Sequence, residues 1–347
     1  MFKVFIAEKI LREIIQAESR RPVNARSNLF KVLKSAMNLY VAMDTPDIEW
    51  IKQLKKEYGL VADKTRTDYI KKIPANPESV LKNPSSLFLL DIPFAEAKKI
   101  QKEYGVMCLS ADNPDISPLI DVNDIHISNE REKLGKGWDT VLNSVEKLPS
   151  NALLLTDRYM FAFRKPHAGD GIANIHEILG QLLPQEFNGG EYHVTIIFDN
   201  INKDTSYTFN DIATQLNRIK QQLGRPYSIM MEVLGITPDC SIYSKLHNRL
   251  IISNYYLVEA SHKLAAFNKD RGTARQLLLP MALFTESSLN GNSTPPLKAI
   301  DLTIATLGEF SKFLSRLHDH KVYYYAVNGK RMEKCIALRN RLINKLE

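Results

Sequence analysis

The chain has 347 residues, of which 44% are hydrophobic and 24% are charged, a balance typical of a globular protein. No segment approaches the roughly 18 uncharged apolar residues that a membrane span needs, and charge interrupts the apolar N-terminal patch too soon for a signal peptide, so we expect a cytoplasmic protein. The cysteines Cys108, Cys240 and Cys335 are too dispersed for a disulfide framework or a thiolate zinc site, and the net charge of +7 permits an anionic partner without requiring one.

A chain of this length is expected to form two domains. The first, residues 1–148, is predicted to be a smaller α/β domain with parallel strands. It begins with a short strand at Lys3–Ile6 inside a largely helical region that extends to about Asp44. A helix follows over Asp47–Tyr58 and ends before Gly59, since glycine is the residue type that most often follows the last turn of a helix.

The segment from Lys52 to Lys72 is the most basic in this half of the chain, with seven Lys or Arg residues against three acids. Tyr58 and Tyr69 are interleaved with the positive charges, a pattern that suits contact with a nucleic-acid backbone. A solvated helix face and loop explains the same charges more simply. The candidate nucleic-acid-binding residues are Lys55, Lys56, Lys64 and Arg66.

A strand, a helix and a second strand are predicted over residues 86–91, 93–104 and 105–112, an order that favours parallel pairing with a right-handed crossover. Acids follow these strands, where open α/β sheets place functional groups. The unit resembles the C-terminal half of a PIN-like nuclease domain, which implies a Mg²⁺ or Mn²⁺ site with Glu8 in place of the family's first acid. The family's middle acid has no visible counterpart, and strand-end or capping acids need no metal. The candidate metal ligands are Asp91, Asp112 and Asp115.

The second domain, residues 149–347, begins at a turn-rich stretch around Pro149. Its strands and helices alternate in the order β-α-β-α-β-β, which predicts a mixed sheet flanked by helices. The predicted elements are a strand within 152–162, a helix at 175–183, a strand at 192–199, a helix at 209–223, strands at 228–235, 246–253 and 255–259, and a helix at 302–317. The basic tail from Lys330 to Lys345 is predicted to be an amphipathic docking helix with Arg339 and Arg341 on its solvated side.

The stretch Ser244–Asn254 concentrates the candidate chemistry of the second domain. His247 and Arg249 are two residues apart at the start of an apolar strand, so an imidazole and a guanidinium point to the same side of the sheet. Both groups suit a phosphate, which arginine can bind through two parallel hydrogen bonds. For a lone histidine, a buried strand position satisfied by the backbone is the usual alternative.

The spacing His247-x-Arg249-x-x-x-x-Asn254 resembles the H-x-K-x-x-x-x-D signature of the phospholipase D-like superfamily. The resemblance covers residues 150–325 and implies a phospholipase D-like domain with His247 as the nucleophile, Arg249 as the phosphate clamp and Asn254 in the aspartate position. After the predicted hairpin, Ser261 and Lys263 stand at the family's small polar turn. The implied phosphate-binding residues are therefore His247, Arg249, Ser261 and Lys263.

The motif also departs from that of the active members of the superfamily. Arg249 keeps the positive charge of the lysine that it replaces. Asn254 lacks the carboxylate that would stabilise an imidazolium, and losing such a group costs about 10⁴ in rate in an analogous triad. Neither His167 nor His318 has the spacing of a second motif, so catalysis would require a homodimer that brings two copies of His247 together.

These features predict a phosphate- or nucleic-acid-binding recognition or assembly subunit rather than an enzyme. Degenerate domains of this superfamily tend to occur in bacterial anti-phage defence and in mobile elements, so the resemblance also implies a protein partner in a complex. The alternative is an enzyme, either a homodimeric phosphodiesterase or nuclease that uses His247, or a metal-dependent nuclease in the first domain. We expect no cofactor, apart from Mg²⁺ or Mn²⁺ in that last case.

Overall fold

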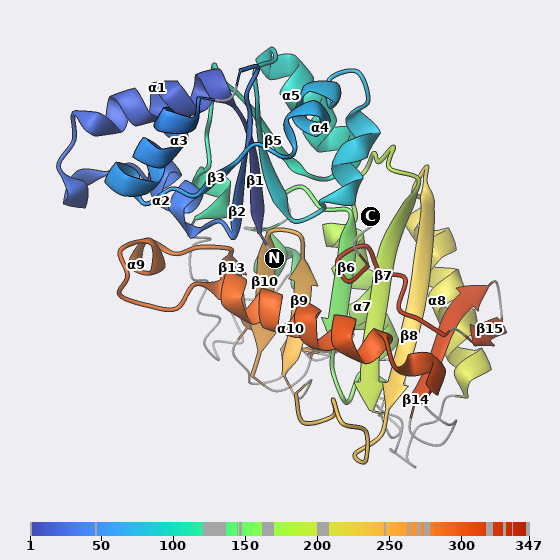
Figure 1. Cartoon of the computed structure of the whole chain (residues 1–347). Coiled ribbons are helices and arrows are strands. Elements are labelled where there is room, and N and C mark those ends of the chain that lie inside the picture. Colours follow the sequence, from blue (N-terminus) through green and yellow to red (C-terminus); the bar gives the residue numbers. More distant parts are fainter. Residues whose placement is uncertain are drawn as a thin grey trace.

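A computed structural model describes residues 2–45, 47–120, 137–143, 145, 148–161, 170–199, 208–245, 248–261, 264, 266–268, 272–273, 278–316, 322–328, 331–334 and 336–344. The protein is α/β and has two main sheets, which confirms the predicted fold class (Figure 1). One sheet of five strands lies in the N-terminal half, and one of eight strands lies in the C-terminal half. Among the described helices, none combines the length and the apolar character needed to cross a lipid bilayer.

The N-terminal sheet is entirely parallel and has the strand order β3-β2-β1-β4-β5. Both of its faces are covered, so its central strands are apolar on both sides: Val4 and Ile6 of β1 enter one core cluster and Phe5 enters the other. Its strands are β1 (Lys3–Ala7), β2 (Asn38–Ala42), β3 (Ala62–Asp63), β4 (Ser86–Leu90) and β5 (Met107–Ser110), and its helices are α1 (Glu8–Ser19), α2 (Asn28–Ser35), α3 (Ile48–Gln53), α4 (Thr67–Lys72) and α5 (Phe94–Tyr104).

Local sequence signals account for most of these boundaries. The Asp47 side chain caps α3 by accepting a hydrogen bond from the Trp50 backbone N–H at 3.0 Å. A π-helical turn continues α3 through Tyr58 and ends at Gly59, whose φ is 69°. The predicted helix over 47–58 and the predicted parallel strand-helix-strand unit over 86–112 are therefore confirmed. The helical region predicted up to Asp44 is wrong in part, because β2 lies within it.

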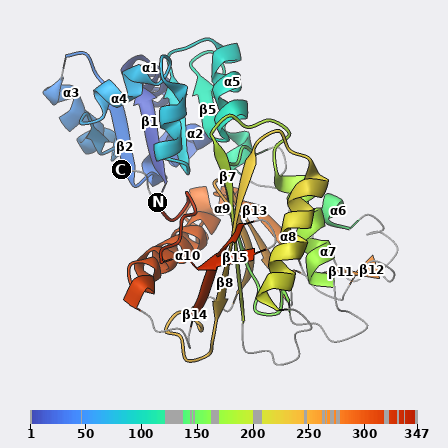
Figure 2. The same ribbon diagram turned by 90° about the vertical axis from the view of Figure 1, so that its right-hand side faces the viewer.

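The C-terminal sheet is mixed, as predicted, and has the order β13-β10-β9-β6-β7-β8-β14-β15. Strands β6, β7 and β8 are parallel, and β9 and β10 form the predicted antiparallel hairpin. Helices α7 and α8 lie on one side of this sheet and α10 lies on the other (Figure 2). Its strands are β6 (Ala152–Thr156), β7 (Glu191–Asp199), β8 (Ser228–Ile236), β9 (Arg249–Ser253), β10 (Tyr256–Ala260), β13 (Leu278–Ala282), β14 (Val322–Asn328) and β15 (Arg331–Lys334).

Five helices accompany this sheet, together with a separate hairpin of two short strands. The helices are α6 (Trp138–Leu142), α7 (Asp170–Leu182), α8 (Phe209–Leu223), α9 (Glu286–Leu289) and α10 (Pro296–Ser311), and the hairpin strands are β11 (Phe267–Asn268) and β12 (Gly272–Thr273). Helix α10 starts six residues earlier than the predicted helix at 302–317. Helix α6 precedes residue 148 but packs on α7, with Trp138 Nε1 donating to Asn174 Oδ1 at 2.7 Å. The predicted boundary at residue 148 stays a prediction.

The basic tail is not the predicted docking helix. Its first part is strand β15, paired with β14, and the described residues 336–344 contain no helix. Arg341, predicted to be solvated, is 5% exposed and donates to the carbonyls of Asn151, Gly189 and Glu191. The Arg339 guanidinium pairs at 3.2 Å with Glu232, which is fully buried. The tail therefore packs against the core of the C-terminal half, and these two arginines donate hydrogen bonds to buried oxygen atoms.

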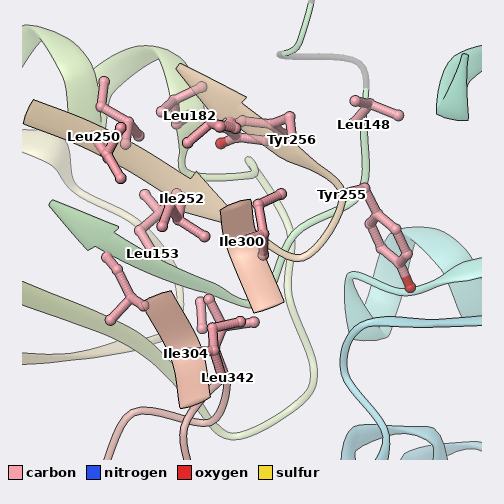
Figure 3. Close-up of a cluster of buried hydrophobic side chains, with 14 of the residues drawn as sticks. Leu148, Leu153, Leu182, Leu250, Ile252, Tyr255, Tyr256, Ile300, Ile304 and Leu342 are labelled. Carbon is pink, nitrogen blue, oxygen red and sulfur yellow. The ribbon is translucent and has the colours of Figure 1, made fainter. Parts of the chain in front are cut away.

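The two sheets meet through the amino ends of their parallel strands. The Tyr255 hydroxyl, in the turn between β9 and β10, donates to the Ser86 carbonyl at 2.6 Å and accepts from the Met107 N–H at 2.7 Å. Ser86 and Met107 are the first residues of β4 and β5. Figure 3 shows the Tyr255 ring pointing away from the cluster around Tyr256 and Ile252 and toward the N-terminal half. The carboxyl edges of both sheets consequently face away from this junction.

Candidate functional site

The carboxyl ends of β6, β7 and β8 form one end of the C-terminal sheet, which we call its carboxyl edge. Chain segments that are far apart in the sequence meet at this edge. The parallel strands β6, β7 and β8 all end there, and β9, antiparallel to β6, starts there, because Thr156 is the register partner of Leu250. Residues 157–161, 237–245 and 248–249 therefore border the same edge. Open α/β sheets bind ligands beyond the carboxyl ends of their strands, so this edge is a candidate site.

Arg249 is a half-buried cation at this edge with no acidic partner. Its guanidinium carbon lies 5.8 Å from the centroid of the Tyr159 ring. Its Nε atom is buried without a hydrogen bond, and within the described part of the chain no carboxylate forms an ion pair with it. Partial burial of an unpaired charge raises the free energy of the folded protein, and an anion that pairs with Arg249 would offset this cost.

Arg158 lies at the same edge but is already held by protein groups. Its guanidinium stacks on Tyr243, 4.1 Å from the ring centroid, and its Nε lies 3.9 Å from Oδ2 of Asp199. Tyr243 also donates to Asp199 Oδ2, at 2.7 Å. This group positions Arg158 and compensates its charge, which distinguishes it from Arg249.

Buried side chains fix the backbone that presents Arg249 and Tyr159. Thr156 Oγ1 donates to the Asn248 carbonyl at 2.7 Å and accepts from the Leu250 N–H at 3.1 Å, so it holds both neighbours of Arg249. Asp157 is 1% exposed, and its carboxylate accepts from the backbone N–H groups of Tyr159 and Leu264. The arginine and the tyrosine therefore project from backbone that is already ordered.

The structure places the predicted motif residues only in part. His247 and Lys263 lie outside the described residues, so their predicted roles stay predictions. Ser261 is exposed and follows β10. Sequence reasoning missed Tyr159 and Arg158, although the run Asp157-Arg158-Tyr159 directly after an apolar strand carries the signal, since polar residues at that place mark the functional edge of a sheet.

Asn254 is not part of the edge that contains Arg249. It follows the opposite end of β9, about 16 Å along the strand. It is fully buried, and its Nδ2 donates to the Pro84 carbonyl at 2.7 Å and to Asn151 Oδ1 at 2.9 Å, while its Oδ1 accepts from the Asn151 N–H. The predicted grouping of Asn254 with Arg249 is corrected: its amide is committed to the domain junction.

The structure does not gather the predicted metal ligands of the N-terminal half into one cluster, and their binding of a metal stays a prediction. Among the residues that the structure describes, no three His, Cys, Asp or Glu groups come together in a way that could hold a metal ion. Asp91 pairs with Lys9 at 3.2 Å, and Asp112 is exposed. Asp115 accepts from the Ser117 N–H at 2.9 Å, and its hydrogen bonds with Ser117 lower its pKa. Asp91 thus pairs with a lysine and Asp115 stabilises a turn, as strand-end and capping acids do.

A cavity of about 650 Å³ lies at the carboxyl ends of β1, β2 and β4. From β1 the chain continues to β2 and β3 on one side, and it then crosses to β4 and β5 on the other side of β1. Such a switch point is where open sheets commonly bind ligands. Its rim cations are nevertheless already paired: Arg12 with Glu8 at 2.7 Å, and Lys71 with Asp44. The contacts of Lys9 with Asp91 and, at longer range, with Glu13 and Asp112 raise the Lys9 pKa. This cavity therefore offers an anion no unpaired cation.

The basic surface predicted to contact nucleic acid is exposed. Lys55 and Lys56 lie on the π-helical turn after α3, and Lys64 and Arg66 lie just before α4. Among the described residues, no carboxylate forms an ion pair with these four. Their role in nucleic-acid binding stays a prediction.

No family model matches this chain, and no curated protein matches it. The phospholipase D-like resemblance therefore depends on the motif around His247, and the PIN-like resemblance depends on the acids that follow the parallel strands.

Proposed function

We propose that the C-terminal domain binds the phosphate groups of a nucleic acid at the edge formed by β6 and β9, and that the protein serves as a recognition or assembly subunit. The observation that carries this proposal is Arg249, a half-buried guanidinium with an orphaned Nε and no carboxylate partner in the described chain. A phosphate would supply the missing charge and accept two parallel hydrogen bonds.

The rest of the chain supports an anionic polymer as the ligand. The net charge of +7 attracts polyanions, and the exposed Lys55, Lys56 and Lys64 add positive surface without acidic partners among the described residues. The sequence places His247 two residues before Arg249, which adds a second phosphate-compatible group.

The proposal predicts a specific loss on Arg249→Ala. Affinity for a labelled oligonucleotide, measured by fluorescence anisotropy, is expected to fall about tenfold, and the slope of log K against log salt is expected to decrease by about one, because one phosphate contact is removed. Arg249→Lys keeps the charge and is expected to preserve the salt slope while losing affinity.

Lys98→Ala is the matched control, because Lys98 is exposed and its ammonium lies 5.5 Å from the ring of Phe94 in a similar cation–aromatic pair on α5 of the N-terminal half. It is expected to leave affinity and salt slope unchanged. Equal binding by Arg249→Ala and the unchanged protein would refute the proposed site.

A cleavage assay on the unchanged protein and on one histidine variant tests the enzymatic alternative. Labelled single- and double-stranded DNA and RNA are incubated with the protein and with His247→Ala. Cleavage that disappears in the variant would establish a phosphodiesterase and overturn the binding-only function. Salt-sensitive retention without cleavage supports the recognition subunit.

A further inference from the structure

Tyr159 exposes an aromatic ring directly beside the unpaired guanidinium. Its side chain is 40% exposed, and its backbone is held by Asp157, whose Oδ1 accepts from the Tyr159 N–H at 2.9 Å. At 5.8 Å from the ring centroid, Arg249 is at the outer limit of a cation–π contact, so that contact adds little stability and does not account for the exposed ring.

We propose that this site takes an unpaired nucleotide of a single strand, whose base stacks on Tyr159 while Arg249 holds its phosphate. The inference rests on the proposed function and adds the class of nucleic acid. Stacking on an aromatic side chain needs an open base face, which a single strand offers. In a duplex, base faces are stacked on one another, so only phosphates remain for Arg249.

The contacts of the neighbouring Tyr243 explain why we expect a single base to stack at this edge. The Tyr243 ring is covered by Arg158 at 4.1 Å, and its hydroxyl is bonded to Asp199. Tyr243 is therefore committed to positioning Arg158, and among the described residues of this edge Tyr159 is the tyrosine with an exposed ring. The pair Tyr159 and Arg249 is thus a stacking surface next to a phosphate clamp.

Three labelled probes test the inference: a short single strand, the same strand with abasic sites, and the corresponding duplex. The intact protein is expected to bind the base-containing strand about tenfold more tightly than the abasic strand. Tyr159→Ala is expected to remove that preference and to leave duplex binding unchanged. Tyr159→Phe is expected to keep the preference, and Tyr159→Leu, which retains apolar bulk without a π-face, is expected to lose it.

Phe94→Ala is the matched control, because Phe94, on α5 of the N-terminal half, is 41% exposed and lies beside a cation, Lys98. It is expected to change none of the three affinities. If Arg249→Ala weakens all three probes but Tyr159→Ala leaves the base preference intact, the stacking inference fails and the proposed function stands. If Arg249→Ala has no effect on any probe, the proposed function fails as well.

Discussion

Arg249 and Asn254 show how far motif spacing determines a site. The spacing predicts that both residues serve one centre, yet a strand separates them. Arg249 is the first residue of β9 and lies at the carboxyl edge of the C-terminal sheet. Asn254 follows the other end of β9 and is buried against Pro84 and Asn151. Of these two residues, Arg249 has a buried polar atom, its Nε, without a hydrogen bond. Spacing along a strand predicts which face a side chain takes, whereas the use of its polar atoms depends on segments far away in the sequence.

At the same scale, Tyr255→Phe is expected to destabilise the fold by about 1–3 kcal/mol. The lost hydroxyl leaves the Met107 N–H and the Ser86 carbonyl buried without the partner that Tyr255 supplies. Chemical denaturation at neutral pH measures the change in the free energy of unfolding.

The adjacent tyrosine provides the control for this prediction. The Tyr256 hydroxyl is also buried, but it lies beside Ser253 without hydrogen-bond geometry and has no partner in the described chain. Tyr256→Phe is therefore expected to cost less than about 0.5 kcal/mol, since no bonded group is left unsatisfied. Equal losses in the two variants would contradict the role assigned to the Tyr255 hydroxyl.

Among the elements, those defined by local signals are predictable from the sequence. The parallel unit over 86–112 and the β9–β10 hairpin have apolar runs bounded by turn residues, and both are confirmed. The β2 strand is missed because its run of four apolar residues, 39–42, lies next to a helix and is too short to show a distinguishing period. The helix predicted for the tail is wrong because Leu338, Leu342 and Ile343 reach the core without a helix. In addition, Arg339 and Arg341 bind acceptors that are distant in the sequence.

The docking of the tail predicts a pH dependence at His193. The Nδ1 atom of this residue, on β7, accepts a hydrogen bond from the Arg341 N–H at 2.9 Å. Burial, together with the charges of Arg341 and Arg339, lowers the His193 pKa to about 3 from 6.5. Between these values the unfolded chain binds a proton that the folded chain does not. Stability is therefore expected to fall with decreasing pH across this window, by up to about 1.4 kcal/mol per pH unit from this residue.

His193→Asn isolates this contribution, because the asparagine oxygen can accept the same hydrogen bond but does not titrate. The difference in unfolding free energy between the two proteins, measured by denaturation from pH 7 to pH 4, is expected to be constant above about pH 6.5 and to move in favour of the variant below it. A difference that stays constant over the whole range would show that His193 titrates normally in the folded protein.

At the scale of the whole molecule, the two sheets join through the amino ends of their strands. The carboxyl edge of each sheet is thereby left on the outside, so the cavity beside Arg12 and the edge at Arg249 lie on opposite sides of the junction. This arrangement depends on contacts between residues more than a hundred positions apart, such as Asn254 with Pro84 and Tyr255 with Met107. The sequence predicts the two domains but contains no local signal for how they meet.

At Gly105 the backbone of the N-terminal half lies against the backbone of Ser150. Gly105 ends α5 with φ of 61°, and a Cβ added there would lie 2.0 Å from the Ser150 carbonyl oxygen, just before β6. Gly105→Ala is therefore expected to lower the free energy of unfolding by more than about 3 kcal/mol, because the backbone of Ser150 cannot rotate away as a side chain could.

Gly224 provides the control, because it ends α8 with φ of 56° but has nothing within 4 Å of an added Cβ. Gly224→Ala is accordingly expected to cost only the left-handed strain, about 1–2 kcal/mol. Thermal unfolding of both variants separates the two contributions, and equal shifts in Tm would mean that the sheets do not approach each other at Gly105.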